Sequence, residues 1–320
     1  MRGSTLHESL DEESLAPSCT AKIVTHFPVI IIAAKDDQVP SVFLKNIKDD
    51  KGIFRLNYDD LGALWDFSFY KGTLKIFTHD VVIAPKAIYH RHPGIRQDNT
   101  YYHKHNAFLE VLDQWNGNFI GERRDNHHNA SKMYQMITSI AKSNEGLDNK
   151  VKVPSSFFVK GSFDLLKSHS KKPLIVKSCS SRRSKVAIQE EFEKWNVENT
   201  KNVPTLFQEQ LSGVDIRVHV SGNHIWPLRI DGKDKIDYRY SDNKVTYTLI
   251  RLQKTLKDFC NNVSRVEGNR LVGIDLMKTE DGYFCLESNP GPAWAMFNHP
   301  SKKKFAEIIL NELKTEGKVL

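Results

Sequence analysis

The stretch that decides the fold is GIDLMKTEDGYFCLESNPGP, residues 273–292. It contains two strand-like runs joined by the turn signal EDG, and this pattern predicts a β-hairpin. Glu287 and Asn289 are two residues apart, so they lie on one face of their strand. A hairpin can bring Asp275 of the partner strand beside Glu287. The hairpin therefore gathers two carboxylates and an amide oxygen at one place.

Such a group of oxygen atoms is unfavourable unless a cation lies among them. Mg²⁺ prefers hard oxygen ligands and keeps water and substrate phosphates in its remaining positions. We therefore predict a metal site formed by Asp275, Glu287 and Asn289. A polar strand face turned to solvent is the alternative.

The composition is typical of a globular protein. The chain has 320 residues, 39% of them hydrophobic, enough for a sizeable core in two or three subdomains. The longest apolar run, FPVIIIAA at 27–34, has the length of a strand. Acidic residues occupy the place where a signal peptide needs its apolar centre. The four cysteines have no CxxC spacing, so they indicate neither a disulfide framework nor a zinc site. We expect a cytoplasmic protein that does not bind a membrane.

The formal net charge of +7 favours anionic partners such as nucleotides, phosphates or an acidic peptide. A surface excess of lysine without a specific partner is the alternative interpretation. We expect no nucleic-acid partner, because no RNP, helix-turn-helix or zinc-finger pattern accompanies the charge.

The order of elements predicts an α/β (α+β) fold with several parts. We expect a disordered acidic tail (1–22), an N-terminal α/β domain (23–105), linker helices with a small subdomain (106–210), and a C-terminal subdomain with the hairpin (211–320). Strands are predicted at 27–34, 72–77, 81–91, 153–159, 173–179, 205–211, 215–222 and 224–230. Helices are predicted at 38–49, 107–115, 130–143, 249–263 and 303–316.

With these elements in this order, the sequence resembles the ATP-grasp superfamily, whose ligases carry such a hairpin with Asp, Glu and Asn on two magnesium ions. The hairpin spacing is similar to that of the RimK-like branch. ASKMYQM and PLIVKSC supply lysines in the expected order, and FQEQLSGVDIRVHVSGNHIW resembles the hinge strand and the element that follows it. Together, AIYHRHP, FQEQ, DIRVHV and DYR resemble the synthetases that mature graspetides, the microviridin-type ribosomal peptides. The resemblance covers roughly residues 25–300.

The resemblance implies an ATP-grasp fold with an N-terminal pre-ATP-grasp domain. It also implies binding of ATP with Mg²⁺, as two ions, or with Mn²⁺. Lysines would face the phosphates, backbone groups of Gln210 and Leu211 would read the adenine edge, and Asp215 would hold the ribose. The implied nucleotide-binding residues are Lys132, Lys177, Gln208, Glu209, Gln210, Leu211 and Asp215.

Two arginines are the implied catalytic residues. Arg217 and Arg239 are planar bidentate donors suited to oxyanions, and Arg239 falls where the family places the arginine that stabilises the acyl-phosphate transition state. A salt bridge from Arg239 to Asp231 or Asp237 is the alternative. The chain also departs from its relatives, because the loop after Lys177 has no glycine but carries several basic residues within 180–185.

These features favour an ATP-dependent ligase that joins a carboxylate to an amine or hydroxyl through an acyl phosphate. We expect a peptide or protein substrate, and a precursor peptide is one such substrate. The sequence also allows a homodimer. An ATP-grasp-fold kinase for a small anionic substrate and a nucleotide-binding scaffold without activity are the alternatives.

Overall fold

The structure is a computed structural model that describes residues 22–24, 29–92, 99–121, 132–159, 173–178, 187–188, 205–232, 237–238 and 245–315. Within these ranges the chain has a mixed α/β fold with four sheets, as the sequence predicts. Residues 1–21 and the basic loop 180–185 lie outside them, so the disorder of the tail stays a prediction.

A parallel sheet forms the centre of the N-terminal domain. Its strand order is β3 (Ile53–Asn57), β2 (Val29–Ala33), β7 (Ala87–His90) and β8 (Asn118–Gly121). Strand β2 is buried along its whole length, as expected for a strand covered on both faces. Its odd-numbered residues share a core with α1 (Gln38–Asn46) and α9 (Lys302–Lys314), and its even-numbered residues share one with α2 (Asn99–Gln114).

A second sheet packs against the same core as α2. Its strand order is β1 (Lys22–Val24), β6 (Val81–Ile83), β5 (Thr73–Thr78) and β4 (Trp65–Tyr70). The tight turn between β4 and β5 has two successive positive φ angles, 48° at Lys71 and 79° at Gly72, as a type I′ hairpin turn requires. A short 3₁₀ helix, Tyr58–Asp60, follows β3.

Two predictions for the N-terminal half were wrong. The expected strand 81–91 is two strands in different sheets, because Pro85 lies between β6 and β7 and cannot donate to a ladder. Strand β8 lies in the range 106–210, for which linker helices and the small subdomain were expected, and it extends the parallel sheet beyond residue 105. Its four buried residues are too few to show a periodic pattern.

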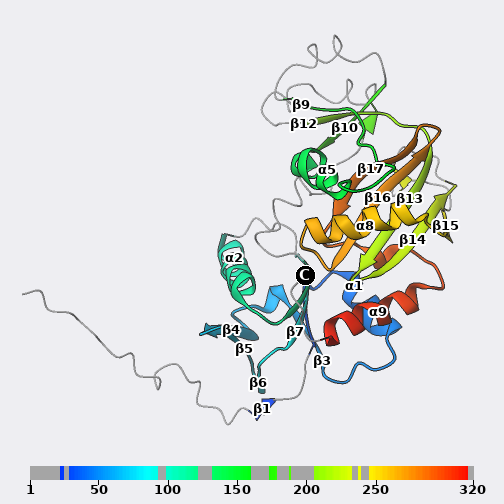
Figure 1. Ribbon diagram of the computed structural model, residues 1–320. Helices are drawn as coiled ribbons and strands as arrows, with labels where there is room; N and C mark the ends of the chain where they lie inside the picture. The colour runs from blue at the N-terminus through cyan, green and yellow to red at the C-terminus, as the bar shows by residue number, and fades with distance from the viewer. Residues whose placement is uncertain are drawn as a thin grey trace, which may run out of the picture.

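The C-terminal half contains two antiparallel sheets (Figure 1). The smaller has the order β11 (Ala187–Ile188), β10 (Leu174–Ser178), β12 (Thr205–Glu209) and β9 (Ser156–Val159). The larger has the order β15 (Thr246–Leu249), β14 (His224–Asp231), β13 (Val214–Ser221), β16 (Leu271–Thr279) and β17 (Gly282–Asn289).

Helix α8 (Lys254–Val266) covers one face of the larger sheet. Leu256, Phe259 and Val263 recur at helical intervals and are buried against it. The helix was expected from residue 249, but Thr246–Leu249 forms the edge strand β15. None of the helices in the described ranges has both the length and the hydrophobicity needed to cross a bilayer.

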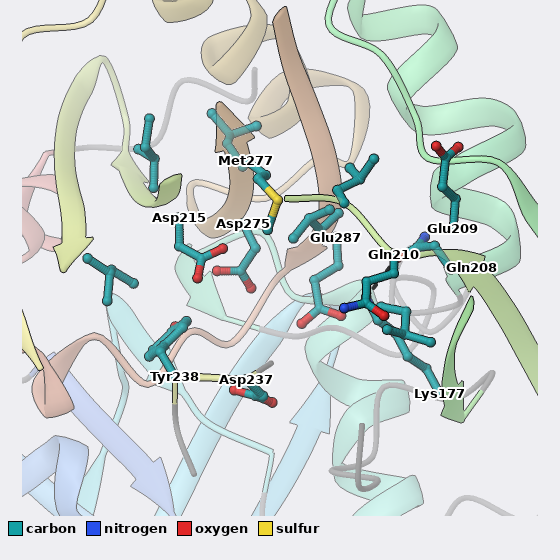
Figure 2. Close-up of a pocket in the computed structure, with 16 residues that line it drawn as sticks. Lys177, Gln208, Glu209, Gln210, Asp215, Asp237, Tyr238, Asp275, Met277 and Glu287 are labelled. Carbon is teal, nitrogen blue, oxygen red and sulfur yellow. Dashed lines mark hydrogen bonds between the residues drawn. The ribbon is translucent and has the colours of Figure 1, made fainter. Parts of the chain in front are cut away.

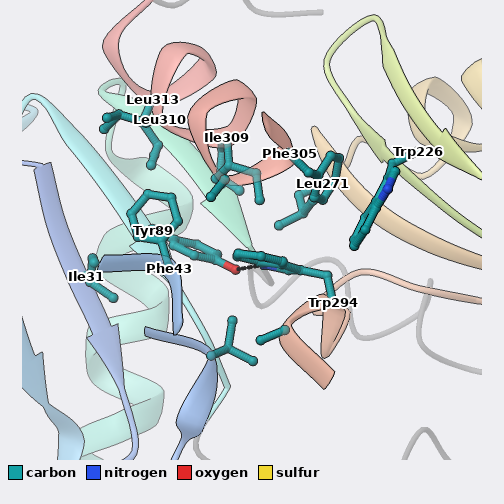
Figure 3. Close-up of a cluster of buried hydrophobic side chains, with 14 of the residues drawn as sticks. Ile31, Phe43, Tyr89, Trp226, Leu271, Trp294, Phe305, Ile309, Leu310 and Leu313 are labelled. Atoms are coloured by element: carbon teal, nitrogen blue, oxygen red, sulfur yellow. Dashed lines mark hydrogen bonds between the residues drawn. The ribbon is translucent and has the colours of Figure 1, made fainter. Parts of the chain in front are cut away.

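The larger sheet and the N-terminal domain share one hydrophobic core, shown in Figure 3. Trp294 lies in its centre, in the short 3₁₀ helix Trp294–Met296, and its Nε1 donates to the Tyr89 hydroxyl at 3.1 Å. Phe43 from α1 and Phe305 from α9 meet the Trp294 ring edge-on, with centroids 6.4 and 5.8 Å away. The two halves are therefore packed together and not merely linked.

Asn118 fastens the end of α9 to the parallel sheet. Its Nδ2 atom donates to the carbonyl oxygens of Glu312, Leu313 and Thr315 at 2.7, 2.7 and 2.8 Å, and its Oδ1 atom accepts from Arg270. The last carbonyls of a helix have no partner within the helix, so Asn118, together with Arg270 at the Glu312 carbonyl, provides the donors that they need.

We predict that Asn118→Ala destabilises the protein by about 2–3 kcal/mol, because it leaves the Leu313 and Thr315 carbonyls without this donor and removes the acceptor of Arg270 Nη1. Thermal unfolding followed by circular dichroism would show a lower Tm. Asn223→Ala, at an exposed turn residue, is the matched control and should leave Tm unchanged. Equal Tm values for the two variants would contradict the role of Asn118.

Candidate active site

The hairpin of β16 and β17 has the register that the sequence predicts. Asp275 lies directly opposite Glu287, and Gly273 opposite Asn289. A β-bulge follows at once, because Leu276 pairs with Cys285 and Leu286 is the extra residue of β17. Opposed residues on antiparallel strands have Cβ atoms about 5 Å apart, so the two carboxylates are close neighbours.

A pocket of about 810 Å³, including its open mouth, lies between the two C-terminal sheets (Figure 2). The lining residues are Ile175, Lys177, Gln208, Glu209, Gln210, Leu211, Asp215, Ile216, Ile230, Asp237, Tyr238, Asp275, Leu276, Met277, Leu286 and Glu287.

The structure brings most of the predicted nucleotide-binding residues to this pocket. Lys177, Asp215 and residues 208–211 line it together with Asp275 and Glu287. Arg217 and Lys132 are not among the lining residues, but they form ion pairs with those two carboxylates. Arg239 lies outside the described residues, so its role stays a prediction.

The predicted hinge strand offers fewer free backbone groups than expected. The Glu209 N–H donates to the Ser155 carbonyl at 2.8 Å, and the Gln210 N–H donates to the Pro173 carbonyl at 2.9 Å. Of the predicted pair, the Leu211 N–H is therefore the better placed to bind a planar base. Apolar walls beside it, including Ile175 and Met277, would cover the faces of such a base.

Each carboxylate of the hairpin has a cationic partner from another element. Lys132 Nζ lies 2.8 Å from Glu287 Oε2, and Arg217 Nη1 lies 2.6 Å from Asp275 Oδ2. All four side chains are largely buried, with at most 20% of any of them exposed. These ion pairs offset the repulsion between the carboxylates.

Lys177 faces the pocket from β10 and is buried. Burial lowers the pKa of Lys177 from 10.5 to about 8, although the nearby Glu287 opposes this shift. Its Nζ donates to Gln208 Oε1 at 2.9 Å, and Gln208 Nε2 donates to Ser156 Oγ at 3.2 Å. Gln208 thus orients a lysine whose charge is poorly solvated, and an anion in the pocket would stabilise that charge.

Ser288, between the two predicted metal ligands of β17, is held by residues that the sequence did not single out. Gln135 donates to its carbonyl at 2.8 Å and accepts from its N–H at 3.1 Å. The Ser288 hydroxyl donates to Glu267 Oε1, which also accepts from Ser139 Oγ at 2.8 Å. Gln135 and Ser139 are the ends of a π-helical turn between α4 (Lys132–Tyr134) and α5 (Ile140–Ser143).

The loop after β17 is fixed from the N-terminal domain. Arg91, just after β7, donates through Nη1 to the carbonyls of Pro292 and Gly291 at 3.1 and 3.4 Å, and through Nε to Asp37. Asn289 Oδ1 accepts from the Gly291 N–H at 3.0 Å. The position of Asn289 therefore depends on a residue almost 200 positions earlier in the chain.

The donor chemistry of the hairpin fits Mg²⁺. Asp275 and Glu287 supply carboxylate oxygens, and the amide oxygen of Asn289 keeps a second lone pair beside its hydrogen bond. No group of three or more His, Cys, Asp or Glu side chains that could hold a metal was found among the described residues. Any metal here would thus use Asn289 or substrate oxygens as well.

Comparison with solved structures decides the fold. The ATP-grasp ligase PsnB, complexed with a minimal precursor, Mg and ADP, superposes with a TM-score of 0.69 at 19% identity, covering 91% of this chain and 99% of PsnB. The chain has the ATP-grasp fold. The macrocyclase MdnC of Microcystis aeruginosa, bound with precursor peptide MdnA, gives 0.69 at 16% identity, covering 89% and 100% of the two chains.

Two further ligases are also similar to this chain. D-alanine–D-alanine ligase from Bacillus anthracis, complexed with ATP, has a TM-score of 0.59 at 15% identity, with 91% and 96% of the chains covered. A probable alpha-L-glutamate ligase of Vibrio atlanticus is 24% identical over 113 residues, which is 35% of this chain. The match spans only 38% of that relative's length. No protein-family model matches the chain.

Lys132 forms an ion pair with Glu287, a carboxylate that the predicted metal would need. We predict that Lys132→Met strengthens Mg²⁺ binding roughly tenfold in the absence of nucleotide, because the lysine competes with Mg²⁺ for Glu287. The same change should weaken ADP binding by a similar factor, because the lysine attracts the phosphates. Isothermal titration calorimetry measures both affinities. Lys142→Met, at an exposed position of α5, is the control. Weaker Mg²⁺ binding to Lys132→Met would contradict the competition.

Glu267 gives the fold a pH dependence. Burial raises the pKa of its carboxyl from 4.5 to about 7, although hydrogen bonds from Ser288 and Ser139 oppose this. The folded protein thus keeps a proton that the unfolded chain loses, and stability falls as the pH rises from 4.5 towards 7. Glu267→Gln should remove this loss. The free energy of unfolding of the variant, relative to that of the wild type, should therefore rise by about 2–3 kcal/mol between pH 5 and pH 8.

Denaturant unfolding at the two pH values tests this prediction. Glu145→Gln, at an exposed position, should change stability equally at both. A constant difference between Glu267→Gln and the wild type would mean that Glu267 does not titrate in this window.

Proposed function

We propose that the protein is an ADP-forming ligase that activates a carboxylate with ATP and joins it to an amine or hydroxyl. The observation that carries the proposal is the pair of opposed carboxylates, Asp275 and Glu287, at a pocket that also exposes Lys177 to its ligand. Two anionic reactants can meet only where cations offset their charge, and this pocket gathers the groups that would hold those cations. The likeness to PsnB and MdnC supports the same activity.

ATP would lie between the two C-terminal sheets. Its adenine would pack between Ile175 and Met277 and accept from the Leu211 N–H, and Asp215 and Glu209 are near enough to the same pocket to bind the ribose hydroxyls. Lys177 would contact the phosphates, and so would Lys132 after release from Glu287.

Asp275, Glu287 and Asn289 would hold Mg²⁺, as two ions, or Mn²⁺ in its place. Bound there, the metal would neutralise charge on the β and γ phosphates. Arg217 keeps Asp275 in place from the opposite strand, and Ser288 keeps β17 attached to the π-helical turn. These contacts would leave the ligand set with little freedom to rearrange.

The reaction would proceed in two steps. A carboxylate oxygen of the substrate attacks the γ-phosphorus, and the bond to ADP breaks. An amine or hydroxyl then attacks the carbonyl carbon of the acyl phosphate, phosphate leaves, and the proton of the nucleophile passes to solvent. Arg217, and Arg239 as we propose, would stabilise the oxyanion that develops in each step.

We propose a peptide as the substrate. PsnB, MdnC and the RiPP-associated ATP-grasp ligase of Chryseobacterium gregarium were each solved with a precursor or a leader and core peptide. The net charge of +7 suits a peptide rich in Asp and Glu. No contact within the described residues favours the kinase alternative.

The reaction class can be tested with ATP, Mg²⁺, hydroxylamine and a panel of Asp- and Glu-rich peptides that also contain Ser, Thr and Lys. We expect ADP, a hydroxamate trapped from the acyl phosphate and, without hydroxylamine, a product lighter by one water per bond. Glu287→Gln should slow ADP formation by roughly 10²-fold, because it removes a charge at the metal site. The exposed turn variant Glu280→Gln is the control.

Two outcomes would reject the ligase. A stable phosphorylated peptide would indicate a kinase. AMP with pyrophosphate would indicate an adenylate intermediate, which this mechanism does not form.

A further inference from the structure

The side chain of Arg217 is fixed at several points. Besides the ion pair of Nη1 with Asp275, its Nε donates to Nε2 of His219 at 3.3 Å, and its guanidinium carbon lies 5.8 Å from the centre of the Phe297 ring. Only 5% of Arg217 is exposed. A long side chain with many rotamers is thus reduced to one arrangement.

The larger sheet leaves room for this arrangement at Gly273. Residue 273 lies opposite His219, and a Cβ atom there would be 2.2 Å from Arg217 Nη2 and 2.7 Å from Pro292 Cβ. These distances are far below van der Waals contact. A side chain at position 273 would therefore displace the guanidinium from the place that it occupies beside Asp275.

The contact with Arg217 determines the protonation state of His219. An arginine can only donate, so Nε2 must carry a lone pair and the ring proton must be on Nδ1. Burial, and then the charge of Arg217, lower the pKa of His219 well below 6.5, which agrees with a neutral ring. His219 is therefore a neutral acceptor that can lie beside a cation.

Packing alone does not explain a histidine at this position. The ring is fully buried among Trp226, Phe297 and Phe305, with centroids 5.3, 5.0 and 5.8 Å away. Its Nδ1 is buried and has no hydrogen-bond partner among the described residues. A phenylalanine would fill the same space without this unsatisfied group, so the value of the imidazole lies in its acceptor atom.

We propose that His219 is a positioning residue that holds Arg217 against Asp275 through the hydrogen bond from Nε to Nε2. This inference rests on the proposed function, in which Arg217 stabilises the reacting oxyanion and orients Asp275. Loss of the acceptor frees the guanidinium to adopt other rotamers, so the cost falls on the chemical step and not on nucleotide binding.

Two substitutions separate positioning from packing. His219→Gln keeps an acceptor near the Nε2 position but fills the aromatic surroundings poorly, whereas His219→Phe fills them and has no acceptor. With ATP, Mg²⁺ and the Asp- and Glu-rich peptides, we expect kcat for ADP formation to fall roughly tenfold in His219→Phe and less than about threefold in His219→Gln, with KM for ATP unchanged in both. Tm should follow the opposite order.

A double variant shows whether His219 acts through Arg217. Arg217→Lys has no Nε–H to hold, so adding His219→Phe to it should change kcat by less than about twofold. A packing role would instead give the same loss in both backgrounds. If kcat followed Tm across the variants, with phenylalanine better than glutamine, the proposal would be overturned.

Nuclear magnetic resonance tests the same contact without turnover. In ¹⁵N-labelled protein we expect His219 to remain the neutral Nδ1–H tautomer between about pH 6 and pH 8, and the Arg217 Nε–H signal to be protected in the wild type and His219→Gln but not in His219→Phe. A protonated His219, or the Nε2–H tautomer, would overturn the proposal. If the wild type formed no ADP with any peptide, the ligase would fail as a function while this measurement still decided the role of His219.

Discussion

Two carboxylates face each other across one pair of strands, and much of the structure can be understood as a response to that constraint. Asp275 and Glu287 are direct neighbours in the register of β16 and β17. Buried charges of the same sign must be compensated by nearby cations. One cation comes from β13, the next strand of the same sheet, and the other from the helical segment that begins at residue 132. The hairpin thus requires that elements earlier in the chain place a cation beside each carboxylate.

Contacts with the hairpin and with the loop after it explain several features that the neighbouring sequence alone does not explain. The π-helical turn brings the amide of Gln135 to the backbone of Ser288, in the same segment whose first residue, Lys132, reaches Glu287. Gly273 is small because an arginine lies across it. Arg91 reaches from the N-terminal domain to the loop after Asn289. Each contact removes one way in which the proposed metal-binding side chains could move, which is how a site becomes preorganised.

The parts of this arrangement that follow from local patterns could be predicted from the sequence. Alternation and the EDG turn identify the hairpin, and two-residue spacing places Glu287 and Asn289 on one face. The roles of Lys132 and Lys177 came from a resemblance, because an isolated lysine has no local pattern that separates a site from a surface. Contacts such as Gln135 with Ser288, 153 residues apart, have no signature in one sequence. The short strand β8 was missed because four residues show no period, and β15 because its last residue also fits a helix.

The contacts of α9 have a consequence for how the protein is made. Asn118 and Leu313 are 195 residues apart, yet the helix that ends near Leu313 packs, together with α1, on one face of the parallel sheet of the N-terminal domain. During translation, β2 and β7 leave the ribosome long before the segment that covers them. Such non-local contacts slow folding and leave apolar surface open to aggregation or chaperones in the meantime. The face of the parallel sheet that α9 covers therefore stays exposed until the hairpin has also been synthesised, and the core shared by the two halves can form only after that.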